Sequence, residues 1–131
     1  MAASDQASFD AFYLAGRWVS EDYRCTSNHT EYVGIDIRNG LLDATKIDSG
    51  GDRCVPTGSR TFSGRLPEQL VVGKSYPVVF VTGVPSQPAC CKSEGHIVVD
   101  SVDELRLCDN PGCRGDQWTI HLRRDDAVAR F

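Results

Sequence analysis

The chain has 131 residues, of which 40% are hydrophobic, and this is enough apolar material for one domain with its own core. Its 14 basic and 18 acidic residues give a net charge of −4 and are interspersed, which excludes the clustered basic surface of a nucleic-acid-binding protein. No apolar run approaches the roughly 20 residues that cross a bilayer, and residues 1–12 do not resemble a secretory signal. We therefore expect a soluble, cytoplasmic protein without a nucleic-acid partner or a membrane span.

From the N-terminus, residues 8–14 have the spacing of a short apolar helical face, which predicts a lid over one end of the fold. Residues 18–25 are expected to form the first strand. In residues 32–38, Val33, Ile35 and Ile37 alternate with polar residues, which predicts a half-buried strand. Asn39-Gly40 supplies a two-residue turn, and residues 41–47 return as the partner strand.

The later strands are separated by segments rich in Gly, Pro and Ser. They are expected at residues 60–66, 76–82, 96–100, 102–107 and 118–123. In the last of these, Trp118, Ile120 and Leu122 share one face. Residues 83–94 form the longest interruption, and a loop of this length is a candidate place for binding.

Many short antiparallel strands favour closure of the sheet, because closure leaves no edge with unpaired backbone groups. We expect an all-β fold, a closed antiparallel β-barrel of about eight strands with a short N-terminal helical turn. The single domain would span residues 1–131, with a lid over 1–15, a barrel over 16–123 and a tail over 124–131. A sandwich of two sheets is the alternative.

Two resemblances agree with a barrel. Gly16-Arg17-Trp18 before an extended strand is similar to the Gly-x-Trp opening of the calycins, the lipocalins and fatty-acid carriers. In those folds the Trp closes one barrel end by packing under a short helix. This resemblance implies a calycin-like barrel and, as one possible role, a carrier of a small apolar ligand.

A longer pattern resembles the C-terminal β-barrel of the F-box-only proteins that target cyclin D. The matching segments are Gly16-Arg17-Trp18-Val19, Glu31-Tyr32-Val33, Ala44-Thr45-Lys46-Ile47, Gly51-Asp52, Val55-Pro56, Gly58 and Thr61, followed by Glu94-Gly95-His96-Ile97 and residues 118–122. The segment between Ile47 and Val55 is about two residues longer than in that family, and we expect no F-box ahead of the barrel. The resemblance implies a barrel that grips a peptide of another protein, and ligase membership does not carry over.

Lys46 shares one face of its predicted strand with Leu42 and Ala44. The simpler interpretation is an exposed lysine, because lysine is rarely buried. If this face turns inward, the ammonium needs a carboxylate or carbonyl partner, which Asp52 or the acidic end of a bound peptide could supply.

Six cysteines lie at positions 25, 54, 90, 91, 108 and 113. In a cytosolic protein they are expected to be free thiols. Cys90, Cys91, Cys108 and Cys113, with His96 or His121, are candidate zinc ligands, but their spacing differs from the paired two-residue gaps of structural zinc sites. A disulfide between Cys108 and Cys113 across the turn at residues 109–112 is the other alternative.

No nucleophile, metalloprotease, phosphate-loop or dinucleotide motif occurs, so we expect a non-enzymatic protein without a cofactor. The leading hypothesis is a barrel that binds a protein or peptide. The alternatives are a lipocalin-like carrier of a small apolar ligand and a structural subunit of a larger assembly. The residues expected to contribute to binding are Trp18, Thr45, Lys46, Asp52 and Trp118.

Overall fold

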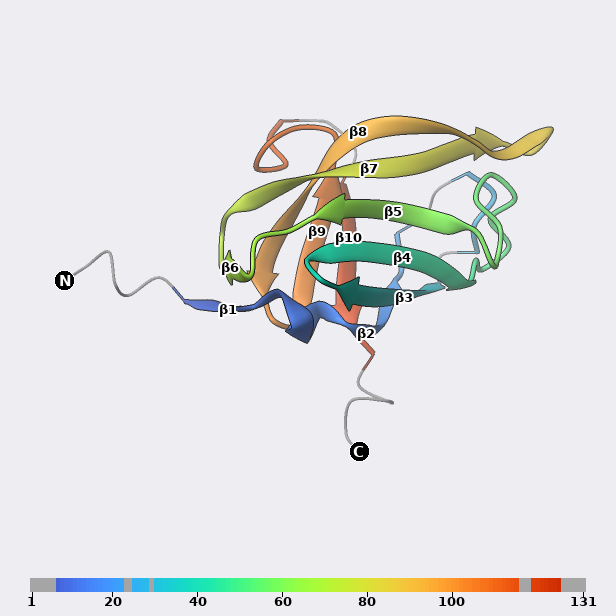
Figure 1. Ribbon diagram of the computed structural model, residues 1–131. Coiled ribbons are helices and arrows are strands. Elements are labelled where there is room, and N and C mark those ends of the chain that lie inside the picture. The colour runs from blue at the N-terminus through green and yellow to red at the C-terminus, as the bar shows by residue number, and fades with distance from the viewer. Residues whose placement is uncertain (1–6, 23–24, 29, 116–118, 126–131) are drawn as a thin grey trace.

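The computed structural model describes residues 7–22, 25–28, 30–115 and 119–125. Its main body is a closed barrel in which every strand pairs antiparallel with its neighbours, in the ring order β10-β2-β3-β4-β5-β7-β8-β9 (Figure 1). The expected all-β fold and the closed barrel of eight strands are confirmed. The barrel strands are β2 (Gly16–Ser20), β3 (Glu31–Arg38), β4 (Leu41–Asp48), β5 (Arg60–Arg65), β7 (Ser75–Val84), β8 (Gln87–Ser101), β9 (Glu104–Cys108) and β10 (Thr119–Arg124).

The β3–β4 hairpin follows the sequence pattern closely. Asn39 and Gly40 both have positive φ, 52° and 78°, as the predicted two-residue turn requires. Val33 and Ile35 on β3 are buried, whereas Asp36, between Ile35 and Ile37, is exposed. The alternation therefore sets both the pairing of these strands and the face that turns inward.

The N-terminal segment covers one end of the barrel. Ser8–Asp10 forms a short strand, β1, that pairs with β6 (Gln69–Val71), and Ala11–Leu14 forms a 3-10 turn, η2. The expected short helical turn is confirmed at Ala11–Leu14 only, because β6 offers a backbone edge with which Ser8–Asp10 pairs instead. Trp18 is fully buried beneath the turn, and its Nε1 donates a hydrogen bond to the Leu14 carbonyl at 2.9 Å.

Arg124, the last residue of β10, fastens this lid to the barrel. Its Nη1 donates to the Ala15 carbonyl at 3.0 Å, and its Nη2 donates to the carbonyls of Tyr13 and Val102 at 2.6 and 2.8 Å. Its guanidinium carbon lies 4.3 Å from the centre of the Trp18 ring. We call this covered end the lid end and the opposite end the mouth.

The β7–β8 hairpin is longer than the sequence suggested. The loop expected over residues 83–94 is wrong, because Val84 pairs with Gln87 and only Pro85 and Ser86 remain for the turn. A register shift between Thr82 and Val84 lets the hairpin continue. Figure 1 shows the hairpin projecting past the neighbouring strands on the mouth side.

Side chains fill the interior of the barrel. The largest fully buried ones include Trp18, Phe62, Leu42, Ile97 and Leu105, which come from five different strands. A barrel of eight strands either fills with side chains in this way or holds one small ligand. Buried side chains from the lid and the strands form one core inside this barrel.

Candidate functional site

Lys46 faces the barrel interior. It continues the inward row of Leu42 and Ala44 on β4, and its exposed fraction is only 1%. The interpretation of Lys46 as an exposed strand lysine is therefore wrong, and the inward alternative holds. The physical reason lies in residues outside β4, which supply the charge that a buried ammonium needs.

Two buried carboxylates receive the Lys46 ammonium. Its Nζ lies 3.0 Å from Glu31 Oε1 and 3.0 Å from Asp52 Oδ2, and the exposed fractions of Glu31 and Asp52 are 0% and 4%. We call these three residues the buried ion cluster. Burying three charged side chains costs desolvation free energy. Their mutual attraction offsets this cost only while all three charges are present.

Asp52 was one of the two partners proposed for an inward Lys46, and Glu31 was not considered. Glu31 begins β3 and lies on the same inward face as Val33 and Ile35, and Val33 is the register partner of Lys46. One sequence signal could have identified Glu31. It has the same two-residue spacing as the apolar residues Val33 and Ile35, and the strand paired with β3 carries the inward Lys46.

The buried ion cluster fixes the β4–β5 connection that borders the mouth. Asp52 Oδ1 accepts hydrogen bonds from the backbone N–H groups of Cys54 and Val55, at 2.8 and 3.4 Å. The Thr26 hydroxyl donates to the Gly51 carbonyl and accepts from the Arg53 N–H, both at 2.7 Å. A large part of this connection is thus held by side chains, although it lies outside the strands.

A disulfide between Cys25 and Cys54 ties the same connection to the segment that follows β2. The Cys54 carbonyl also accepts a hydrogen bond from the Ala89 N–H at 2.8 Å, which links it to the β7–β8 hairpin. Three chain segments that are distant in sequence therefore meet at Cys54. We call these three joined segments the rim of the mouth.

A pocket of about 270 Å³ opens within this rim. Val55, Phe80 and Ile120 give it apolar surface, and Thr61, Thr82 and Ser93 give it hydroxyl groups. Asp52 and the Cys25–Cys54 disulfide also border it. We call it the mouth pocket. It combines an apolar floor with several hydrogen-bonding groups, an arrangement that suits a short, partly apolar chain segment.

The residues predicted for binding are dispersed. Lys46 and Asp52 meet in the buried ion cluster, and Asp52 borders the mouth pocket. Trp18 is buried at the lid end, and Thr45 is exposed on the outside of β4. Trp118 lies outside the described residues. The binding roles of these residues remain predictions.

The expectation of free thiols is wrong, since all six cysteines form disulfides: Cys25–Cys54, Cys90–Cys91 and Cys108–Cys113. Tertiary folding brings Cys25 and Cys54 together across a separation of 29 residues, which sequence spacing did not reveal. The four thiolates considered for zinc are divided between two of these disulfides. Cys25, Asp52 and Cys54 have ligand atoms within 4.8 Å of one another, but both sulfurs are already bonded.

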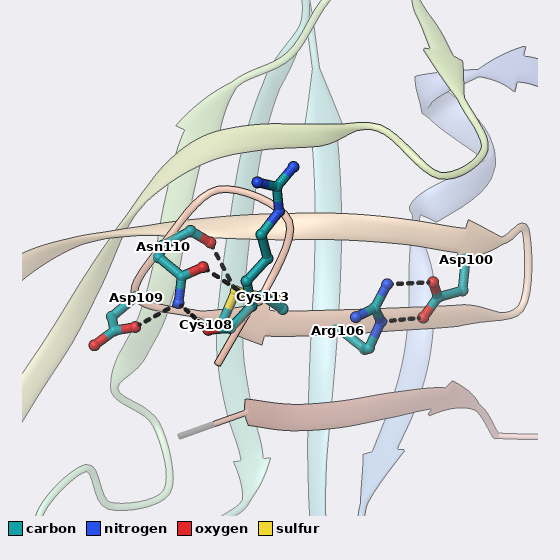
Figure 2. Close-up of a disulfide and its surroundings, with 7 residues drawn as sticks. Asp100, Arg106, Cys108, Asp109, Asn110 and Cys113 are labelled. Carbon is teal, nitrogen blue, oxygen red and sulfur yellow. Dashed lines mark hydrogen bonds and ion pairs between the residues drawn. A yellow bond between two sulfur atoms is a disulfide. The ribbon is translucent and has the colours of Figure 1, made fainter. Parts of the chain in front are cut away.

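The Cys108–Cys113 disulfide closes the turn that the sequence offered as an alternative (Figure 2). Asn110 stabilises the turn, because its Oδ1 accepts from the Arg114 N–H at 2.7 Å and its Nδ2 donates to the Arg114 carbonyl at 3.1 Å.

Figure 2 also shows the paired hydrogen bonds from Arg106 to Asp100, at 2.8 and 3.0 Å, on the neighbouring strands. These hydrogen bonds raise the pKa of Arg106, and the ion pair joins β8 to β9.

His121 contacts a carboxylate at the border of an open pocket of about 330 Å³ on the outside of the strands, which Asp22 and Glu104 also line. Its Nδ1 is 3.3 Å from Asp22 Oδ2, and its side chain is 65% exposed. In water an exposed pair of this kind is weakly coupled. The geometry therefore gives His121 a surface contact.

No protein-family model matches the chain, and the comparisons with curated proteins and with solved structures also return no match. Among the helical residues that the structure describes, none belongs to a helix long and apolar enough to cross a membrane.

Proposed function

We propose that this protein is a non-enzymatic binding module and that its mouth pocket takes a short peptide segment of another protein. The observation that carries the proposal is the mouth pocket, which is bordered by apolar side chains and hydroxyl groups. Pockets of about 360 and 410 Å³ also lie beside the lid, but the disulfide and the buried ion cluster that order a rim are found at the mouth. The resemblance to the F-box-only barrels supports the same type of ligand, without implying ligase membership.

The size and chemistry of the pocket favour a peptide over a lipid. At about 270 Å³ it lies just below the roughly 300–1,000 Å³ typical of small-molecule sites, so it suits one or two side chains. A calycin-like carrier needs a roomy apolar lumen, and here Phe62, Leu42 and Ile97 occupy that space. Thr61, Thr82 and Ser93 instead offer hydrogen-bonding partners for a backbone.

A rigid rim makes this site suitable for binding. The buried ion cluster and the Cys25–Cys54 disulfide order the rim before a ligand arrives, so less conformational entropy is lost on association.

The three disulfides also favour an oxidising compartment over the cytoplasmic location expected from sequence. Alkylation of thiols in the protein isolated from its source without reductant tests this point, and complete labelling of the six cysteines would contradict it.

A displayed library of random twelve-residue peptides, selected on the purified protein, tests the proposed function. We expect enriched peptides that share an apolar position and that lose at least tenfold in affinity when Thr82→Phe fills the pocket. Ser86→Phe, at the exposed hairpin turn, is the matched control and should leave affinity unchanged. Failure to enrich any peptide, or equal loss with both variants, would overturn the proposal.

A further inference from the structure

The β8 strand has a free backbone edge near the mouth. It runs for 15 residues, but its pairing with β9 begins only at His96, whereas its pairing with β7 covers Cys91 to Val98 without interruption. No strand described in the structure pairs with the other side of Cys91–Gly95. Figure 1 shows this part of the hairpin extending past β9. Gly95 is buried and Cys91 is bonded to Cys90, whereas Lys92, Ser93 and Glu94 are exposed, so we call Lys92–Glu94 the open edge.

Natural proteins usually protect such an edge with charges or covering segments, because it can pair with another chain. Residues 75–91 carry no charged side chain, and the charges of the hairpin begin at Lys92 and Glu94. Both of these side chains are exposed, and strand alternation places them together on the outer face. Ser93 between them lines the mouth pocket and therefore faces inward.

The order of these residues makes the open edge complementary to itself. We propose that two copies of this chain pair antiparallel along their open edges, with Ser93 opposite the partner's Ser93 across a two-fold axis. That register uses the whole open edge, because Ser93 is its central residue. It places Lys92 opposite the partner's Glu94 and Glu94 opposite the partner's Lys92, on one face of the joined sheet.

This register combines backbone pairing with two identical ion pairs. Oppositely charged residues that face each other across an antiparallel pair stabilise it, and like charges destabilise it. A two-fold interface repeats each contact, so one substitution alters both pairs. An extended peptide from another protein would use the same backbone edge, but it would not require this arrangement of Lys92 and Glu94.

Sedimentation equilibrium over a range of protein concentrations tests the proposal. The wild-type chain is expected to form a reversible dimer. Lys92→Glu and Glu94→Lys should each raise the dissociation constant at least about tenfold, because each substitution creates two like-charged pairs. Lys74→Glu makes the same charge change at an exposed turn outside the open edge and should leave the constant unchanged.

A mixture of the Lys92→Glu and Glu94→Lys chains separates this interface from a folding defect. In the mixed dimer every facing pair again has opposite charges, so the mixture should dimerise more tightly than either variant alone. A wild-type chain that stays monomeric at all concentrations, or a mixture that fails to dimerise, would overturn the proposal. So would tighter dimerisation of Lys92→Glu, which would identify Lys92 as a residue that blocks edge pairing.

Discussion

Replacement of Lys46 by methionine is the sharpest test of the buried ion cluster. Methionine keeps much of the side-chain length but removes the ammonium, and it leaves Glu31 and Asp52 as two buried carboxylates without their shared cation. Their exposed fractions are 0% and 4%, so water cannot easily replace the lost partner. Breaking a buried ion pair in this way costs about 3–5 kcal/mol.

That loss is a large share of the roughly 5–15 kcal/mol by which domains are stable. For a chain of 131 residues it corresponds to a fall in Tm of roughly 10–20 °C. Urea unfolding at neutral pH, followed by circular dichroism, measures the free energy of unfolding of the variant and of the wild type. Lys74→Met removes an exposed lysine whose ammonium lies 5.8 Å from the centre of the Tyr76 ring, and it is expected to change the free energy of unfolding by less than about 1 kcal/mol.

A triple variant shows whether the loss comes from uncompensated charge. Glu31→Gln, Lys46→Met and Asp52→Asn together remove all three charges, and the asparagine oxygen can still accept from the Cys54 N–H. We expect this variant to recover at least half of the stability that Lys46→Met loses, because no buried charge remains. A cost below about 1 kcal/mol for Lys46→Met alone would refute the assignment of a buried ion cluster.

Two further substitutions test the packing of the barrel by thermal unfolding. Gly95→Ala should lower the free energy of unfolding by about 1–3 kcal/mol, because a Cβ there would overlap the Phe80 ring. Gly34→Ala is the control, since its Cβ would meet only the flexible end of the Ile47 side chain. Equal effects of the two substitutions would contradict the close packing at Gly95. Arg124→Met should cost about 2–3 kcal/mol through the loss of its hydrogen bonds to lid carbonyls and its contact with Trp18. Arg123→Met loses one exposed ion pair and should cost under about 1 kcal/mol, and a similar cost for both arginines would argue against the fastening of the lid.

Local patterns were sufficient to predict the strands that have one apolar face and a turn of defined chemistry. The β3–β4 hairpin followed from the alternation of Val33, Ile35 and Ile37 and from Asn39-Gly40. The β7–β8 hairpin was harder to predict, because Pro85 and Pro88 signal a loop while the backbone between and around them still pairs. Short strands such as β1 and β6 depend on each other as partners, and neither has a pattern of its own.

The candidate site was predictable only in part, since its members come together from separate segments. Lys46 and Asp52 were recognised because they lie close in sequence and one could neutralise the other. Glu31 lies on a different strand, and the register of β3 against β4 determines its approach. The pairing of Cys25 with Cys54 has the same origin, as it joins two connections at the mouth.

The sequence by itself determined the all-β character of this protein, because that character follows from a period of two and from turn residues that act over a few positions. It favoured closure into a barrel but left a sandwich of two sheets open, and the pairing of β10 with β2 closes the ring. Only the tertiary structure decided which face of β4 turns inward, which cysteines pair and where the barrel stays open. Those outcomes depend on contacts between segments distant along the chain. A buried lysine, in particular, becomes favourable only when the fold places carboxylates beside it.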